Sequence, residues 1–368
     1  MIVELKDVCN KGTSNVRQKD IVSKPGDYPI YGASGLAGNV NFYQQEKASV
    51  AVVKDGAGIG RAMLLPAKAS IIGTMQYLIP KDNVLPEYLY YAVRNMHLEK
   101  HYSGATIPHI YFKDYKKEKF NLVSLNQQRK IITLFNGIEN TINKRKKELS
   151  KLDTLIKARF VEMFGDPLRN DRTWPISKLK LLTTKIGSGA TPKGGKQSYK
   201  KEGITLVRSM NVHDGEFVYK DLAYIDTAQA HDLDNVELQP KDVFINITGA
   251  SVARSCVIPD NILPGRVNQH VAIIRCKENL LNYIFLNRLF LNSSFKQKLL
   301  AMGQAGGATR QALTQEQLKK LNLILPPIEL QNEFASFVQQ VDKSKVAIQK
   351  SLDETQTLFD SLMQKYFS

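Results

Sequence analysis

Apolar residues recur with a heptad period in two long segments of this chain, and neither segment contains proline. In the segment from about Asn126 to Met163, only Arg145 and Arg159 interrupt the two apolar series. Alternating steps of four and three, flanked by polar faces, are typical of a coiled-coil seam. The seam residues that we expect to pair are Ile131, Phe135, Ile138, Ile142, Leu149, Leu152 and Ile156 in the first segment, and Phe334, Val338, Val341, Ile348, Leu352, Phe359 and Leu362 in the second.

Each of these helices alone would expose an apolar stripe to water. A homodimeric coiled coil would bury the stripe, but two copies within one chain have a high effective concentration for each other. We therefore expect the helices to pair within the chain, in antiparallel sense because each follows its own globular region. A helix of this length spans on the order of 55 Å, which predicts two similar domains held apart by a two-helix spacer.

The two globular regions resemble each other. The stretch VAVVKDGAGIGR, which ends at Arg61, aligns with VFINITGASVAR, which ends at Arg254, at an offset of 193 residues (254 − 61). The same offset places Gln76 over Gln269. Each match alone is weak, but the preserved order of strand, turn, Arg, Pro and Gln indicates an internal repeat.

Toward the helices the offset grows to 203 residues (367 − 164). SGAT at 103–106 recurs as GGAT at 306–309, and the offset then continues without a gap to Phe164 over Phe367. Each region combines short strands and turns with one helical run. We therefore predict a mixed α/β (α+β) fold with a pseudo-two-fold internal repeat. Its expected parts are two globular domains at 1–122 and 166–325, and two helical regions at 123–165 and 326–368.

Composition narrows the class of partner. The chain has 368 residues and carries 51 Lys and Arg against 35 Asp and Glu, a formal net charge of +16. Such an excess favours an anionic partner, with nucleic acid ahead of a membrane surface. No apolar run approaches the ~18 residues of a membrane span, and MIVELKDVCNKG is unlike a signal peptide. With Cys9, Cys256 and Cys276 lacking metal-ligand spacing, we expect a cytoplasmic protein without a metal.

The chemistry-bearing motifs of common enzymes are missing. DGAGIGR has Arg61 where a dinucleotide-binding turn needs its third glycine, and GSGATPKGGK is followed by Gln197 where a phosphate loop needs Ser or Thr. The histidines at 97, 101 and 109 have no second metal-ligand motif beside them, so surface or binding roles are favoured. No amino-methyltransferase motif, nuclease cluster or ATPase loop occurs. We expect a protein without catalytic residues or cofactors of its own.

The repeated turn is suited to contacting nucleic acid. Arg pairs with guanine and Gln or Asn with adenine in the major groove, whereas Lys and Arg also hold phosphates. For any one of these residues, a solvated position on the surface is about as favoured as a DNA contact. The recurrence of Arg61 as Arg254 favours a DNA contact for that pair. The candidate DNA-binding residues are Lys54, Arg61, Gln76, Lys193, Arg208, Arg254, Asn268 and Gln269.

Over essentially its full length, the chain resembles the specificity subunit of type I restriction–modification systems. The resemblance rests on YPIYGASGLAG, GATIPHIYFKDYKKEKF, LNQQRK at the start of the first long helix, FGDP (164–167) at its end, and LILPPIELQNE before the second. It implies two target-recognition domains, each binding half of a split, asymmetric double-stranded DNA site. It also implies that the paired helices set the spacer and dock two methyltransferase subunits, and that restriction subunits join them. S-adenosylmethionine and ATP are implied for those partners only.

Two other classes of function remain as alternatives. A coiled-coil scaffold or adaptor with basic ends, binding acidic partners, would explain the helices and the charge but not the repeated turn. A single chain that fuses specificity with catalysis is disfavoured by the missing enzyme motifs.

Overall fold

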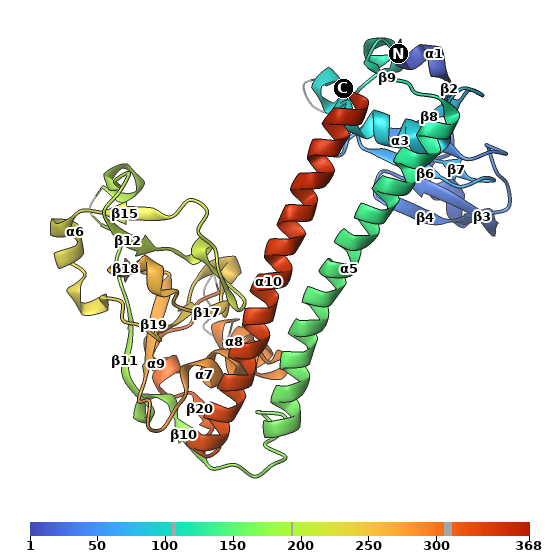
Figure 1. The fold of residues 1–368 in the computed structure, drawn as a ribbon. Coiled ribbons are helices and arrows are strands. Elements are labelled where there is room, and N and C mark those ends of the chain that lie inside the picture. Colours follow the sequence, from blue (N-terminus) through green and yellow to red (C-terminus); the bar gives the residue numbers. More distant parts are fainter. Residues whose placement is uncertain (105–107, 193, 305–310) are drawn as a thin grey trace. The chain divides into compact units, whose positions relative to one another are not determined.

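The computed structural model describes residues 1–104, 108–192, 194–304 and 311–368. The chain divides into two compact units. The first unit comprises Met1–Lys147 together with Ile348–Ser368, and the second comprises Glu148–Ala347. Each unit therefore contains part of both long helices, α5 (Leu125–Phe164) and α10 (Ile328–Phe367) (Figure 1).

The first unit is built on three small sheets and short helices. In order across each sheet, its strands are β2 (Cys9–Thr13), β8 (Met75–Pro80), β5 (Ser49–Val53) and β6 (Ala62–Leu65); β4 (Gly35–Val40), β3 (Pro25–Gly32) and β7 (Ser70–Ile71); and β1 (Ile2–Glu4) and β9 (Lys119–Asn121). Its shorter α-helices are α1 (Leu5–Val8), α2 (Gln18–Val22), α3 (Pro86–Asn95) and α4 (Phe112–Tyr115).

The second unit repeats these sheets and adds one hairpin. In order across each sheet, its strands are β11 (Thr183–Ser188), β19 (Val271–Cys276), β16 (Val243–Asn246) and β17 (Ser255–Val257); β15 (Ala223–Ile225), β12 (Ile204–Val207) and β18 (Gly265–Val267); β10 (Ile176–Lys178) and β20 (Asn322–Ile324); and β13 (Val212–His213) and β14 (Glu216–Phe217). Its shorter α-helices are α6 (Thr227–His231), α7 (Tyr283–Leu291), α8 (Ser293–Gln304) and α9 (Gln315–Lys319).

The topology confirms the predicted mixed fold and internal repeat. The four-stranded sheets are antiparallel in both units, and each three-stranded sheet has one parallel pair, β3 with β7 and β12 with β18. The central strands β5 and β16 are buried along their whole length, which accounts for their largely apolar sequences. Both long helices have 40 residues, and their bounds differ by 203 at each end.

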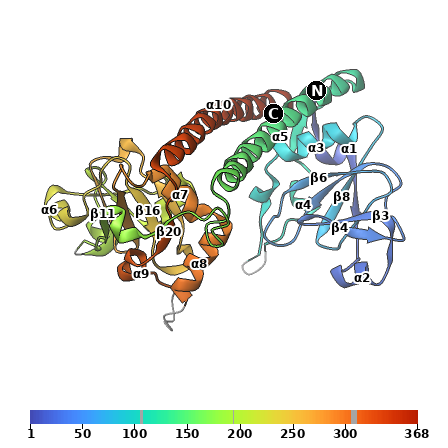
Figure 2. The same cartoon turned by 90° about the horizontal axis from the view of Figure 1, so that it is seen from below.

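Within each unit the two long helices pack side by side and run antiparallel (Figures 1 and 2). In the first unit the ring of Phe135 lies 5.2 Å from that of Phe359. Farther along α5, Arg145 donates to the carbonyl oxygen of Ser351 at 2.7 Å and also contacts Thr355. The residue number therefore rises along one helix as it falls along the other.

The second unit pairs the other parts of the same helices in the same sense. The ring of Phe160 lies 5.5 Å from that of Phe334, and Lys345 Nζ lies 2.7 Å from Asp153 Oδ1. The predicted seam residues that are buried across the two units are Ile131, Phe135, Ile142, Ile156, Phe334, Val338, Val341, Leu352 and Phe359. Those that are half-buried are Ile138, Leu149, Leu152, Ile348 and Leu362.

The helix ends are fixed by aromatic packing that the seam pattern did not include. Phe164, at the end of α5, packs on Phe285 of α7 with ring centroids 4.8 Å apart. Phe367, at the end of α10, packs on Tyr88 of α3 at 4.9 Å. The last turn of α5 therefore packs in the second unit, and the last turn of α10 packs in the first.

The helix starts are held by a buried glutamine. Gln128 accepts a hydrogen bond from the backbone N–H of Leu85 at 2.8 Å, and its amide nitrogen donates to the carbonyl oxygens of Asn83 and Val123 at 3.0 and 2.9 Å. Its side chain is fully buried. Gln331, the residue 203 positions later (331 − 128), makes the same three kinds of bond in the second unit, to Asn282, Leu280 and Pro326.

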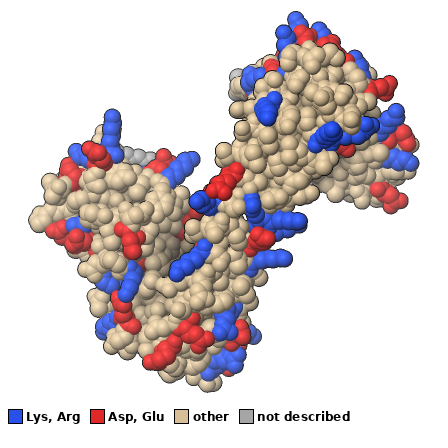
Figure 3. All heavy atoms as spheres, viewed as in Figure 1, with Lys and Arg blue, Asp and Glu red and all other residues tan. Residues whose placement is uncertain are grey.

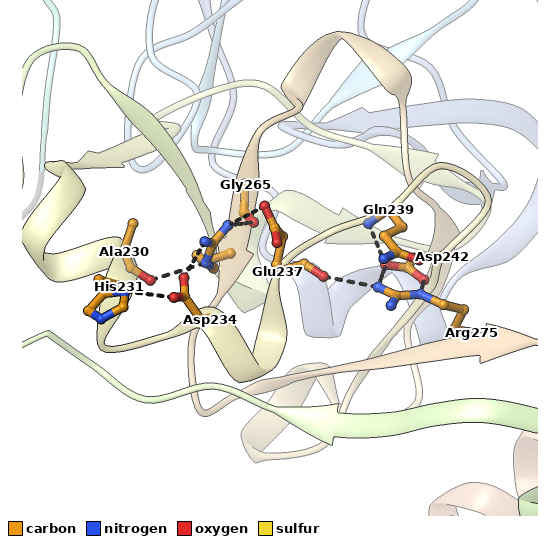
Figure 4. Close-up of polar contacts among 9 residues, drawn as sticks. Ala230, His231, Asp234, Glu237, Gln239, Asp242, Gly265 and Arg275 are labelled. Atoms are coloured by element: carbon orange, nitrogen blue, oxygen red, sulfur yellow. Dashed lines mark hydrogen bonds and ion pairs between the residues drawn. The ribbon is translucent and has the colours of Figure 1, made fainter.

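Two arginines fix the segment that connects β15 to β16 in the second unit (Figure 4). Arg266 donates to the carbonyl oxygens of Ala230 and Gly265 and pairs with Asp234 at 2.7 Å. Arg275 pairs in bidentate fashion with the fully buried carboxylate of Asp242, at 2.8 and 2.9 Å. These contacts attach this connection, which contains α6, to strands β18 and β19.

Candidate nucleic-acid interface

The repeated glycine stretches form two turns with the same backbone. We call Lys54–Arg61, between β5 and β6, the first turn, and Ile247–Arg254, after β16, the second turn. In the first, the N–H of Val53 donates to the Arg61 carbonyl at 3.0 Å; in the second, the N–H of Asn246 donates to the Arg254 carbonyl at 2.8 Å. These bonded pairs differ by 193 at both ends, so the sequence offset is also a structural one.

A glycine in left-handed conformation opens each turn. Gly56 has φ +92° and Gly249 has φ +75°, a region that glycine enters without steric cost. A side chain added at either position would meet no atom within 4 Å, so the glycines are required by their backbone conformation and not by close packing.

A later segment pairs with each turn. The N–H of Gly56 donates to the Pro108 carbonyl at 3.0 Å, and the N–H of Ile110 donates to the Lys54 carbonyl at 2.9 Å. In the second unit the equivalent bonds join Gly249 to Gln311 and Leu313 to Ile247, at 2.9 and 2.8 Å. The offsets of 193 and 203 thus belong to two segments that touch. The GGAT match at 306–309 lies outside the described residues, as does the second half of SGAT, at 105 and 106.

The first turn presents a carboxylate between two basic groups. Asp55 is ion-paired with Lys54, and its Oδ1 lies 2.7 Å from His109 Nδ1. Although burial opposes the shift, hydrogen bonds from Lys54 and His109 lower the pKa of Asp55, which keeps it ionised at neutral pH. Arg61 is exposed and donates to the Ala33 carbonyl at 3.2 Å.

The second turn presents a hydroxyl in place of that carboxylate. Thr248, which corresponds to Asp55, lies 2.6 Å through its Oγ1 from His270 Nδ1. Gln269, the residue before His270, is exposed, and its side chain contacts both His270 and Thr191. Arg254 is half-buried at the end of the turn. The two turns therefore have similar backbone conformations, and the hydrogen-bonding groups of their side chains differ.

Two of the predicted base-contacting residues are buried, and the structure corrects both assignments. Gln76 lies on β8 between two neighbouring strands, is 4% exposed, and donates to the Gly12 carbonyl at 3.2 Å. Asn268 is 5% exposed and accepts from the N–H of His270 at 3.0 Å. Both amides satisfy the backbone inside the fold and are not available on the surface.

The remaining candidates have mixed positions. Arg208 is half-buried, donates to the Asp221 carbonyl and lies over the ring of Tyr199 with its guanidinium carbon 5.5 Å from the centroid. Lys193 lies outside the described residues. On the face drawn in Figure 3, Lys and Arg side chains are dispersed over both units and interleaved with Asp and Glu.

The three cysteines are protonated thiols, and the described residues contain no metal-ligand cluster. Burial raises the pKa of the Cys9, Cys256 and Cys276 thiols to about 12, so they are protonated at neutral pH. Across the described residues, no group of three or more His, Cys, Asp or Glu side chains is arranged to hold a metal ion.

The model of the type I restriction modification DNA specificity domain matches this chain twice, over residues 1–152 and 172–355. The chain belongs to that family. It is a specificity subunit of a type I restriction–modification system, as the sequence resemblance predicted, and the scaffold alternative is not favoured.

Curated relatives and solved structures agree with this assignment. This chain is 22% identical over 315 residues to the type I restriction enzyme MjaIX specificity subunit of Methanocaldococcus jannaschii. The match covers 78% of this chain and 69% of that protein. The MjaVIII specificity subunit of the same organism is 20% identical over 306 residues, covering 78% and 71%.

Two solved structures share the fold. The crystal structure of the type I restriction–modification S subunit from M. genitalium matches with a TM-score of 0.64 at 14% identity, covering 100% of this chain and 96% of that one. A second structure, from work on the structural basis of complex assembly and conformational transition of the type I restriction–modification system, matches with a TM-score of 0.56 at 16% identity. The match covers 100% of this chain and 97% of that one.

Sequence reasoning missed several polar residues of this specificity subunit's turns. Asp55 and Thr248 were passed over in favour of the arginines that end the turns, and His270 was not considered. A usable signal was present: Asp55 and Thr248 are aligned by the repeat yet differ in chemistry, which is expected where two repeated domains have different ligands.

Proposed function

We propose that each unit of this specificity subunit binds one half of a split DNA site, and that the two half-sites differ in sequence. The observation that carries the proposal is the pair of turns closed by equivalent backbone hydrogen bonds but with unlike side chains. An acceptor-only carboxylate at Asp55 and a hydroxyl at Thr248 suit different base edges in the major groove.

We propose that Arg61 and Arg254 contribute base contacts at their own half-sites, and that Lys54, Arg208 and Lys193 hold phosphates. Arg61 is the more favourable of the two because it is exposed and makes one bond to a backbone carbonyl, which leaves further guanidinium N–H groups for guanine. Arg61→Ala and Arg254→Ala are each expected to cost ~1–3 kcal/mol of binding and to relax only one half-site. Equal weakening on all sequences would instead assign these residues to phosphate contacts.

We also propose that the chain has no catalytic role and that partner subunits supply the chemistry. Two methyltransferase subunits would bring S-adenosylmethionine, and restriction subunits would bring ATP-dependent cleavage. The long helices offer repeat-related apolar positions for two such copies: Leu155 and Leu358, 203 residues apart (358 − 155), are 47% and 51% exposed. Exposed leucines at equivalent positions of two helices favour two equivalent docking contacts.

The docking proposal is tested by copurification of the specificity subunit with tagged methyltransferase subunits. Leu155→Glu and Leu358→Glu are each expected to remove one methyltransferase copy, and the double variant both. Val346→Glu is the matched control, because Val346 is 70% exposed and its repeat counterpart, Asn143, is polar. Full assembly of the double variant would refute docking at these leucines.

The DNA proposal is tested by binding to duplex DNA across a salt series, with and without methyltransferase subunits. If about six to ten phosphates are contacted, affinity falls by several decades between low and moderate salt. None of the helices that the structure describes is long and apolar enough to cross a membrane; we propose a cytoplasmic complex. Salt-independent binding would leave the fold assigned and the DNA role refuted.

A further inference from the structure

We propose that Gln269 contacts an adenine in the half-site bound by the second unit, and that Thr191, His270 and Thr248 hold its amide in position for that contact. This inference rests on the proposed DNA function and specifies the base that one of the two units recognises.

A continuous chain of polar contacts fixes the Gln269 side chain. The hydroxyl of Thr191 donates to Gln269 Oε1, and Gln269 Nε2 lies 3.0 Å from His270 Nε2. With Gln269 Nε2 facing the ring, His270 Nε2 is the acceptor and the ring proton is on Nδ1, because an amide nitrogen can only donate. In that arrangement the Nδ1 proton is donated to Thr248 Oγ1, 2.6 Å away, so the second turn holds the other side of the ring.

The backbone beneath this chain is equally constrained. The N–H of Gly189 donates to the Asn268 carbonyl at 3.2 Å, and the N–H of Ile247 donates to the His270 carbonyl at 2.9 Å. A side chain at Gly189 would place its Cβ 1.8 Å from the Val267 carbonyl oxygen, so only glycine allows β11 to approach so closely. Buried Asn268 caps the N–H of His270 from within. Gln269 therefore projects from a connection anchored to both β11 and the second turn.

The unused capacity of the amide matches adenine. Thr191 occupies one lone pair of Oε1 and His270 occupies one hydrogen of Nε2, which leaves one acceptor site and one donor. The major-groove edge of adenine offers the N6 amino donor and the N7 acceptor, the complementary pair, whereas guanine offers two acceptors. Rotating the amide by 180° exchanges its two partners and, with the ring proton on the other nitrogen of His270, again leaves one acceptor site and one donor free.

The first unit lacks this arrangement. Gln76, the repeat counterpart of Gln269 (269 − 76 = 193), is 4% exposed and its amide donates to the Gly12 carbonyl. At the first turn, His109 contacts a carboxylate in place of a hydroxyl. The contact between Gln269 and adenine therefore has no glutamine counterpart in the first unit.

The test uses the specificity subunit coexpressed with its methyltransferase subunits. A genome-wide map of methylated sites first defines the wild-type half-sites, and duplex binding then compares wild type with Gln269→Ala and with the isosteric Thr191→Val. We expect Gln269→Ala to lose about 10- to 100-fold discrimination at one adenine of the second half-site, and Thr191→Val to lose part of it. The first half-site should be unchanged in both variants, and Gln239→Ala, an exposed glutamine of the same unit, should match wild type.

A base analogue makes the assignment specific. Replacing that adenine by 7-deazaadenine removes the N7 acceptor, so it should weaken wild-type binding and leave Gln269→Ala binding unaffected. Equal weakening of both proteins by the analogue, or changed preference at a base other than adenine, would overturn the inference while leaving the DNA function intact. Salt-independent binding by the wild type would instead remove the DNA function itself.

Discussion

Single buried polar residues connect the long helices to each unit. The amides of Gln128 and Gln331 are fully buried, and each makes three hydrogen bonds to backbone groups that precede or begin a helix. Replacement by an apolar residue of similar size would leave those backbone groups desolvated without partners, at about 1–3 kcal/mol for each.

We therefore predict that Gln128→Leu lowers the stability of the first unit by about 2 kcal/mol or more. Hydrogen exchange followed by mass spectrometry should show faster exchange near residues 83–85 and at the start of α5, with the second unit unchanged. Gln331→Leu should give the mirror result near residues 280–282. Gln127→Leu is the control, because this neighbouring side chain is exposed and, among the described residues, accepts hydrogen bonds only from the backbone N–H and the hydroxyl of Ser124. Uniform exchange in Gln128→Leu would contradict the prediction.

The same residue scale shows where sequence reasoning fails. Gln269 is exposed, whereas its repeat counterpart Gln76 and its neighbour Asn268 are buried. The residue type alone does not distinguish these amides, because an amide side chain can hydrogen-bond a backbone carbonyl as readily as the edge of a base. Whether it lies inside depends on which strands flank it, and sequence offsets do not carry that information.

At the scale of elements, the heptad pattern predicted the long helices well. An apolar stripe with period 3.5 admits few alternatives over forty residues. The pattern did not predict Phe160 and Phe164, which are buried against Phe285 and Phe334. Near its end a helix is surrounded by a globular unit, so burial extends beyond the two seam positions that a coiled coil would use.

The contacts of Arg275 and those of Arg266 should contribute unequally to the stability of the second unit. Arg275→Met would leave the carboxylate of Asp242 charged and fully buried, and removing one partner of a buried pair costs about 3–5 kcal/mol. Arg266→Met would leave Asp234 and Glu237 largely solvated, at 52% and 56% exposure, so the main loss is the bonds to two carbonyls, about 1–3 kcal/mol.

Thermal unfolding of the two variants, with hydrogen exchange to localise the change, checks this order. In Arg266→Met the faster exchange should be confined to residues 226–238, whereas in Arg275→Met it should spread into β16 and β19. A larger loss in Arg266→Met than in Arg275→Met would show that solvent exposure of the carboxylates does not decide the cost.

At the scale of the whole molecule, the internal repeat was predictable because two constant offsets covered the turns and the helices. The structure explains why there are two. The turn and the segment that pairs with it are joined through α3 in the first unit and through α7 and α8 in the second, and this connection is ten residues longer in the second (203 − 193). The insertion lies between contacts that are otherwise equivalent.

The helices should also determine how many unread bases separate the half-sites. Inserting seven residues in α5 after Lys147 and seven in α10 after Ala347 keeps the heptad register in both units, because both insertions fall at the boundary between them. At ~1.5 Å of rise per residue this adds about 10 Å, or about three base pairs of DNA at ~3.4 Å each. We expect the methylation map of this variant to keep both half-sites and to show a gap longer by about three bases.

The matched controls distinguish helix length from a general loss of structure. Insertion in only one helix shifts that helix against its partner, so the seams of the two units cannot both be satisfied, and both methylation and thermal stability should fall. Insertion of four residues in both helices adds a full turn but breaks the 3.5-residue period, which should also weaken pairing. A stable double-heptad variant that methylates sites with the original gap would show that the helices do not determine the spacing, because every contact within each unit would have been retained.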